Sequence, residues 1–218
     1  MNTFKATCPS ELRSYIETEI IPRYAGFDKA HQVDHATKVI SESLMLAKSY
    51  PVKAEMVYVI AAYHDLGLSK GREFHHIESG KILLEDDRLK HWFTDEQLTL
   101  MQEAIEDHRA SSKHEPRSIY GKIVAEADRI INPEVTLRRT VQYGLSHHPE
   151  KGKEEQYGRF CAHLKEKYAD GGYLKLWIPE SSNALKLKEL RIIIESESTL
   201  RGFFERIYNE ETKPVVIR

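Results

Sequence analysis

The sequence predicts an all-α protein, and three features carry that prediction. Apolar residues recur at helical spacing along most of the 218 residues, as in the stripe formed by Val39, Ile40, Leu44, Met45 and Leu46. Helix start signals, either a capping residue or a proline in a first turn, stand between these segments. Nowhere does the sequence alternate between apolar and polar residues in the way that a half-buried strand does.

The expected helices follow one another along the whole chain. They cover, in order, residues 10–23, 33–49, 51–65, 75–85, 94–108, 116–131, 133 onward, 159–168 and 183–210. Pro51, Pro116 and Pro133 each suit a first helical turn, so we expect a helix to begin at each of them. Thr94 and Gln97 have the spacing of a capping box.

Polar or glycine-containing segments separate the helices. Gly67 fits the end of the third helix, and residues 68–74 and 111–116 are expected to be loops. The composition becomes strongly charged after His148, so the chain is predicted to hold two parts. Residues 1–145 would form a helical core, and residues 146–218 a C-terminal helical extension packed on the same domain.

Composition excludes several classes of protein. The formal net charge is −2, so no overall field attracts long nucleic acid or a membrane surface. The two cysteines, Cys8 and Cys161, support neither a disulfide framework nor a cysteine-based zinc site. Without a signal-like N-terminus or a long apolar stretch, a cytoplasmic location is expected.

Histidine is unusually frequent, with eleven residues, and several lie where helices should begin or end. The adjacent pair His64 and Asp65 closes an apolar helical run, where both side chains can turn toward one metal ion. The candidate metal ligands are His35, His64, Asp65, His76, His108 and Asp128. A set of imidazoles and carboxylates without thiolates suits a hydrolytic or redox-active divalent metal, not a structural zinc site.

The order of these residues resembles the HD-domain superfamily of metal-dependent phosphohydrolases over roughly residues 30–131. The sequence AYHDLG is similar to the central motif of that family, and His35 and Asp128 stand in the expected order around it. HHIESG resembles the helix start of the binuclear members. AIEDHR followed by KIVAEADRI resembles the paired motifs that carry their last histidine and aspartate.

The resemblance implies an HD-domain helical bundle with a C-terminal helical extension and a site for two divalent ions. His35, His64, Asp65 and Asp128 would surround the first ion. Asp65 would bridge to a second ion held by His76 and His108, although the neighbouring His75 leaves the ligand at that helix start open by one residue. Fe, Mn, Co, Ni, Mg and Zn are not distinguished by this set. Two such ions about 3.5–4 Å apart generate hydroxide and hold the phosphoryl oxygens.

Residues around the ligands are candidates for catalysis and substrate binding. Asp65 would position the metal-activated hydroxide. His31, one turn before His35, would act as a general acid, a substrate contact or a support for a ligand, or would be a solvated loop residue. The candidate phosphate-binding cations beside ligand-bearing helix ends are Lys70, Arg72, Arg109, Lys113 and Arg129. A structural alternative pairs Asp128 with Arg129 or Arg138.

The expected function is hydrolysis of a phosphate ester or anhydride in a small nucleotide or phosphorylated metabolite. Two alternatives stay open. Some HD-type proteins with the same ligands are di-iron oxygenases that cleave C–C or C–P bonds, and a ligand-sensing helical module without catalysis is the other alternative. The last predicted helix would belong to the ordinary core, cover the pocket, or pair two chains as a homodimer.

Overall fold

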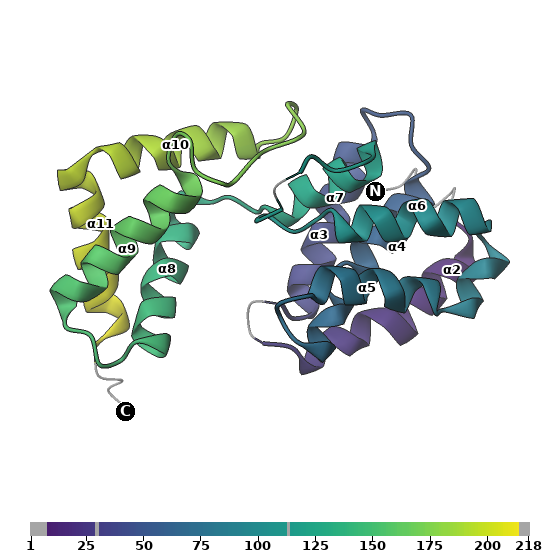
Figure 1. The fold of residues 1–218 in the computed structure, drawn as a ribbon, viewed down its shortest axis with the longest axis horizontal. Helices are drawn as coiled ribbons and strands as arrows, with labels where there is room; N and C mark the ends of the chain where they lie inside the picture. Colours follow the sequence, from purple (N-terminus) through teal and green to yellow (C-terminus); the bar gives the residue numbers. More distant parts are fainter. Residues whose placement is uncertain (1–7, 29–30, 113, 214–218) are drawn as a thin grey trace. The chain divides into compact units, whose positions relative to one another are not determined.

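The computed structural model describes residues 8–28, 31–112 and 114–213, and its regular structure there is entirely helical (Figure 1). The all-α prediction is confirmed. The elements are α2 (Ser10–Tyr15), η1 (Ile16–Ile20), η2 (Ile21–Gly26), α3 (Val33–Ala47), α4 (Ala54–Tyr63), η3 (Leu66–Lys70), α5 (His75–Leu84), η4 (Asp87–His91), α6 (Asp95–Glu106), α7 (Ile119–Asp128), α8 (Pro133–His147), α9 (Lys153–Tyr168), α10 (Asn183–Glu195) and α11 (Glu197–Glu211).

The chain divides into two units between Arg129 and Ile130. The first unit holds the elements from α2 to α7 together with Trp177–Ser181, and the second holds α8 to α11. This division comes earlier than the predicted boundary after residue 145, because α8 packs against α9, α10 and α11. That the extension packs on the same domain stays a prediction.

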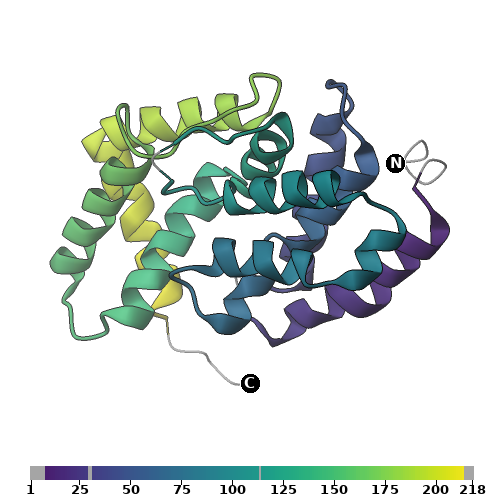
Figure 2. The ribbon, with the colours of Figure 1, turned by 45° about the vertical axis from the view of Figure 1, so that its right-hand side comes forward.

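Helix α4 is the centre of the first unit. Its residues from Met56 to Tyr63 are all buried, so the helix is apolar on every side, as expected for a core helix. Helices α3, α5, α6 and α7 all contact it. α5 and α6 lie side by side in the views of Figures 1 and 2.

Local sequence signals explain most helix starts. The capping box is present, with Gln97 N–H donating to Thr94 Oγ1 at 3.4 Å and Thr94 N–H donating to Gln97 Oε1 at 3.0 Å. Pro133 occupies the first turn of α8 behind its cap. The helix starts predicted at the two other prolines are wrong. Helix α4 begins at Ala54, after the extended residue Lys53, and α7 begins at Ile119, after the capping residue Ser118.

Gly67 brings two elements together instead of ending α4. It lies in the 3-10 turn η3, which replaces the start of the loop predicted for residues 68–74. Its N–H donates to Ser79 Oγ at 2.8 Å. A Cβ atom at Gly67 would lie 2.1 Å from the carbonyl oxygen of His75, so only glycine permits this approach of η3 to the start of α5.

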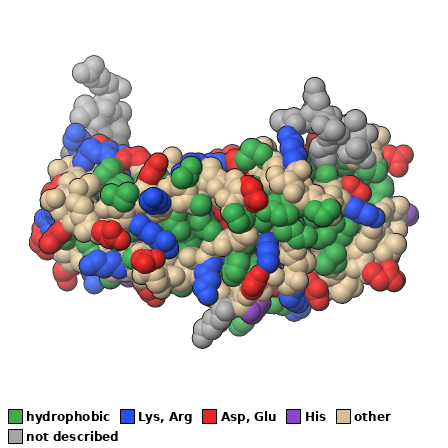
Figure 3. Space-filling view, turned by 90° about the horizontal axis from the view of Figure 1, so that it is seen from above, with side chains coloured by type: hydrophobic (Ala, Val, Ile, Leu, Met, Phe, Trp, Pro, Cys, Tyr) green, Lys and Arg blue, Asp and Glu red, His purple; other side chains and the backbone are tan. Residues whose placement is uncertain are grey.

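The second unit combines an aromatic core with ion pairs. The rings of Tyr157, Phe160 and Phe204 pack with centroid distances between 5.1 and 6.4 Å. The guanidinium of Arg138 pairs with glutamates of α8 and α11. None of the helices among the described residues combines the length and apolar character needed to cross a bilayer. On the face drawn in Figure 3, basic and acidic side chains are interspersed.

Candidate metal centre

The site is built where the chain leaves α4. The helix ends at Tyr63, and His64 follows it with helical dihedral angles. Asp65 then adopts φ −111° and ψ 5°, so the backbone turns between the two residues. His64 is completely buried and Asp65 is 4% exposed, so the core fixes both side chains.

A first group of ligand atoms gathers around one carboxylate oxygen, Asp65 Oδ2. His35 Nε2 lies 3.6 Å from it, and His64 Nε2 lies 3.2 Å from it. Asp128 Oδ1 lies 3.3 Å from His35 Nε2 and 3.8 Å from His64 Nε2. The two Nε2 atoms are 3.3 Å apart. The structure therefore brings together the four residues predicted around the first ion.

A second group gathers around the other oxygen of the same carboxylate. His75 Nε2 lies 3.5 Å from Asp65 Oδ1, and His108 Nε2 lies 3.4 Å from it. Helix α5 supplies the first histidine, and the second follows the end of α6. Asp65 thus joins two groups of three residues whose ligand atoms lie within 4.8 Å of one another. A carboxylate placed in this way can bridge two cations.

Three of the four histidines are oriented by the same hydrogen bond. The Nδ1 atom of His64 lies 2.8 Å from the carbonyl oxygen of Ala61, and the equivalent distances are 2.8 Å for His75 and 2.6 Å for His108. Each carbonyl belongs to the third residue before the histidine. Because a carbonyl only accepts, the proton is on Nδ1 in the neutral ring, and the Nε2 lone pair faces Asp65.

Electrostatics at the site favour ionised carboxylates. Burial alone would raise the pKa of Asp65, but the imidazoles around it hold that pKa well below its ordinary value. Burial would also raise the pKa of Asp128, but the hydrogen bond with His35 outweighs burial and lowers that pKa. In turn, the pKa of His35 rises to about 9, because the bonds with Asp128 and Asp65 outweigh burial.

These features fit a divalent cation. Imidazole lone pairs and carboxylate oxygens that face one another at 3.2–3.8 Å repel unless a proton or a cation lies between them. The raised pKa of His35 shows that the metal-free cluster attracts protons instead. Imidazole and carboxylate donors suit Mn, Fe, Co, Ni and Zn.

The histidine at the start of α5 differs from the prediction. His75 faces Asp65, and the predicted ligand His76 points away into a neighbouring cleft. The Nδ1 atom of His76 is buried without a hydrogen-bond partner among the described residues. Burial and the nearby His108 and His75 lower the pKa of His76 to about 4. His75 therefore replaces His76 in the second group.

His31 lies beside the first group. Its ring centroid is 5.6 Å from that of His35, and its Nδ1 atom lies 2.8 Å from Asp28 Oδ1. The carboxylate thereby fixes the ring and leaves Nε2 for another partner. Asp28 was not predicted from the sequence, although its position three residues before His31 is the spacing of a local pair. Its side chain also lies 3.7 Å from Arg72 Nη1.

The predicted substrate-binding cations lie in different environments. Lys70 Nζ pairs with Glu78 Oε2 at 3.0 Å, and Arg72 is largely exposed. Arg129 is buried, donates from Nη1 to the carbonyl of Ala125, and has its pKa lowered by burial. Arg109 lines a cleft, and Lys113 lies outside the described residues.

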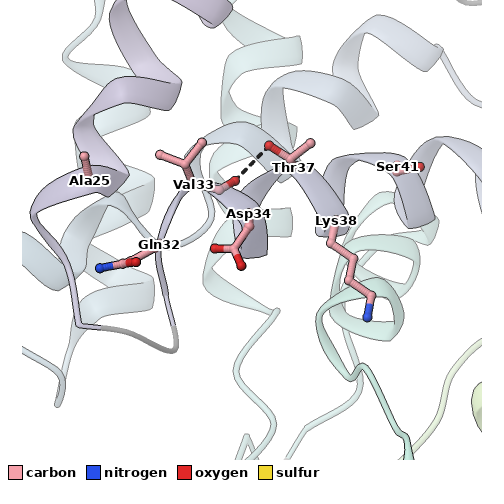
Figure 4. Close-up of a pocket in the computed structure, with 7 residues that line it drawn as sticks. All are labelled: Ala25, Gln32, Val33, Asp34, Thr37, Lys38 and Ser41. Atoms are coloured by element: carbon pink, nitrogen blue, oxygen red, sulfur yellow. Dashed lines mark hydrogen bonds between the residues drawn. The ribbon is translucent and has the colours of Figure 1, made fainter. Parts of the chain in front are cut away.

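Two clefts lie on the first unit. One cleft has a volume of about 820 Å³ and is lined by His76 and Arg109, the residues that directly follow His75 and His108. The other, of about 840 Å³, lies at the start of α3 (Figure 4). There Thr37 Oγ1 donates to the Val33 carbonyl at 2.8 Å, and none of the candidate ligands lines the cleft. The first cleft is thus lined by residues next to the second group of ligands, and the other is lined by Asp34, which is next to the ligand His35.

Comparisons with known proteins agree with this arrangement. Residues 33–132 match the family model of the HD domain. One solved structure, of a predicted HD superfamily hydrolase from an uncultured Thermotogales bacterium, is 18% identical with a TM-score of 0.55. The alignment covers 96% of this chain and 98% of that chain, so the two share a fold. No curated protein sequence matches this one.

Proposed function

We propose that this chain, which belongs to the HD-domain superfamily through residues 33–132, is a metal-dependent phosphohydrolase with two divalent ions. Its substrate is a phosphate ester or anhydride of a small nucleotide or another phosphorylated metabolite. The hydrolytic class is supported by the family. The phosphoryl substrate is inferred from the paired groups of ligand atoms and from the cations near them.

The observation that carries the proposal is the placement of Asp65. Its Oδ2 atom lies 3.2 Å from His64 Nε2, and its Oδ1 atom lies 3.4 Å from His108 Nε2. In this proposal, His35, His64 and Asp128 hold one ion and His75 and His108 hold the other. When bound, the ions would lower the pKa of a water molecule and neutralise charge on the phosphoryl oxygens.

The remaining steps belong to the protein's own residues. The buried histidines keep their Nε2 atoms fixed through their Nδ1 bonds, so little reorganisation is needed when ligands bind. His31, whose Nδ1 donates to Asp28, would act from its imidazolium form: it would give its Nε2 proton to the leaving oxygen and return to the neutral ring with the proton kept on Nδ1. A cationic residue then has to hold the anionic part of the substrate, and Arg109 at the neighbouring cleft is suited to that role.

The experiment measures metal content and phosphate release in the same samples. The chain is stripped and reloaded separately with Mn, Fe, Co, Ni, Mg or Zn, and the bound ions are counted by elemental analysis. Each form is then assayed on nucleoside mono-, di- and triphosphates and on sugar phosphates. We expect two ions per chain and phosphate release, with a loss of about 100-fold or more in Asp65→Asn.

Two results contradict the proposal. One is the absence of phosphate release from every substrate with every metal. The other is substrate-dependent oxygen uptake by the iron-loaded chain without phosphate release from an ester or anhydride, which would favour an oxygenase. Binding of a substrate without turnover would instead favour the sensing module. The variant His31→Gln separates acid catalysis from metal binding, because its metal content should stay at two ions.

A further inference from the structure

The cleft beside the metal centre, here called the His76–Arg109 cleft, has a volume of about 820 Å³. Its lining residues come from the start of α5, the end of α6 and the segment that leads toward α7: His76, Ile77, Glu106, Asp107, Arg109, Ser111, Ser112, His114, Glu115 and Arg117. The volume lies within the range of small-molecule sites.

Two adjacent residue pairs connect the cleft to the metal centre. At the start of α5, His75 faces Asp65 and His76 faces the cleft. At the end of α6, His108 faces Asp65 and Arg109 lines the cleft. The rings of His75 and His76 are 5.5 Å apart between centroids, so the residue that faces Asp65 is in contact with one that lines the cleft. A small molecule in the cleft would lie next to the second group of ligands.

The acidic residues of the cleft already have cationic partners. Arg117 Nε lies 3.1 Å from Asp107 Oδ1, and Arg117 Nη2 lies 2.8 Å from Glu106 Oε2. Glu115 pairs with Lys122. These carboxylates are therefore neutralised by the protein and offer little attraction to a further cation.

Donor groups in the cleft are left without such partners. Arg109 Nη1 donates to the carbonyl of Glu73 at 2.6 Å, but among the described residues no carboxylate lies within 4 Å of its guanidinium. The imidazole of His76 lines the cleft, and its Nδ1 atom is buried, so Nε2 is the ring nitrogen left for a ligand. His114, Ser111 and Ser112 add further polar groups to the lining. A planar guanidinium beside an imidazole and hydroxyl groups suits an oxyanion.

We infer that the His76–Arg109 cleft binds a second anionic group of the substrate, through Arg109 and His76. The substrate class is then a compound with two anionic groups, of which the phosphoryl group reacts at Asp65 and the other, a phosphate or carboxylate, is held in the cleft. This inference rests on the proposed function. The size of the cleft leaves room for the sugar or nucleoside part of the substrate beside the second anion.

The first test needs no activity, so its failure is distinct from failure of the proposed function. Inorganic phosphate is titrated into the metal-free full-length chain by calorimetry, after circular dichroism has shown that it is folded. We expect saturable binding that weakens roughly tenfold or more in Arg109→Gln and in His76→Asn. Lys48→Gln, which removes an exposed cation outside the cleft, is the matched control.

The second test uses the metal-loaded chain and the two kinds of substrate. Arg109→Gln should raise KM about tenfold for substrates with two anionic groups and by a clearly smaller factor for p-nitrophenyl phosphate, which lacks the second anion. Arg109→Lys should recover part of the loss. The inference is overturned if the folded metal-free chain binds no phosphate up to about 10 mM, or if Arg109→Gln changes phosphate binding no more than Lys48→Gln does.

Discussion

The hydroxyl of Tyr24 accepts a hydrogen bond from the backbone N–H of Asp65 at 3.3 Å. The same hydroxyl donates to the carbonyl of Ala62 at 3.0 Å. Tyr24 is completely buried, and its ring stacks against His64 with centroids 6.2 Å apart. One side chain thus holds both residues of the His64–Asp65 pair where the backbone turns out of α4.

The variant Tyr24→Phe tests this positioning role. Removing the hydroxyl leaves a buried N–H and a buried carbonyl without this partner, so we expect a loss of about 1–3 kcal/mol in the free energy of unfolding. Metal affinity should also fall, because Asp65 loses a constraint. Calorimetric titration with Mn²⁺ measures this. Tyr15→Phe, which removes a hydroxyl bonded to Asp86, should cost stability without weakening metal binding.

The sequence was informative about the ligands for a physical reason. His35, His64, Asp65, His108 and Asp128 lie at or near expected helix ends, and the resemblance of their order to the HD-domain superfamily implied that they share one site. The sequence could not decide between His75 and His76, because adjacent residues of a helix point in directions that differ by about 100°. Only the seating of α5 on η3 decides which of them faces Asp65.

The supporting residues were harder to predict. No motif marks Tyr24 or Asp28. Ser79 stands in the HHIESG segment, but its residue type does not predict that its hydroxyl accepts the N–H of Gly67. Gly67 was predicted as a helix stop. A stop and a close approach both require glycine, so the residue type alone does not separate them.

The variants His75→Ala and His76→Ala form a matched pair for the second ion. His75 Nε2 lies 3.5 Å from Asp65 Oδ1, whereas His76 lines the cleft. We expect elemental analysis to find about one ion per chain in His75→Ala and two in His76→Ala. The opposite pattern would return the ligand role to His76.

Gly67→Ala tests the approach of η3 to α5. The added Cβ would meet the carbonyl oxygen of His75 at 2.1 Å and the backbone nitrogen of Ser79 at 2.6 Å, so backbone has to move. We expect destabilisation of about 1–3 kcal/mol and loss of the second ion, because His75 moves with α5. Gly26→Ala is the control, since a Cβ there meets nothing within 4 Å. Denaturant unfolding and metal counting give both readouts.

The metal-free chain should lose stability as the pH rises from neutral to about 9. Burial lowers the pKa of His35, but the hydrogen bonds with Asp128 and Asp65 raise it by more. The pKa therefore reaches about 9 in the folded state, against an ordinary value of 6.5. The protonated His35 therefore contributes fully to the free energy of unfolding below pH 6.5, and this contribution is lost as the pH rises through about 9. His35→Gln should flatten the decline in Tm between pH 7 and 9. An equally steep decline in that variant would show that other groups cause it.

Glu126 attaches the segment Trp177–Ser181 to α7 within the first unit. The glutamate is completely buried and accepts hydrogen bonds from the backbone of Trp177 at 2.7 Å and from the hydroxyl of Ser181. In Glu126→Gln, an amide N–H₂ replaces an oxygen that faces donors. We therefore expect a loss of about 1–3 kcal/mol and faster proteolysis within the segment. Glu180→Gln alters an exposed side chain of the same segment that accepts a hydrogen bond from the Tyr50 hydroxyl at 2.5 Å. Because the amide oxygen of glutamine can accept the same bond, both the free energy of unfolding and the cleavage rate should stay close to those of the unchanged chain. Equal cleavage rates in the two variants would mean that Glu126 does not hold the segment in place.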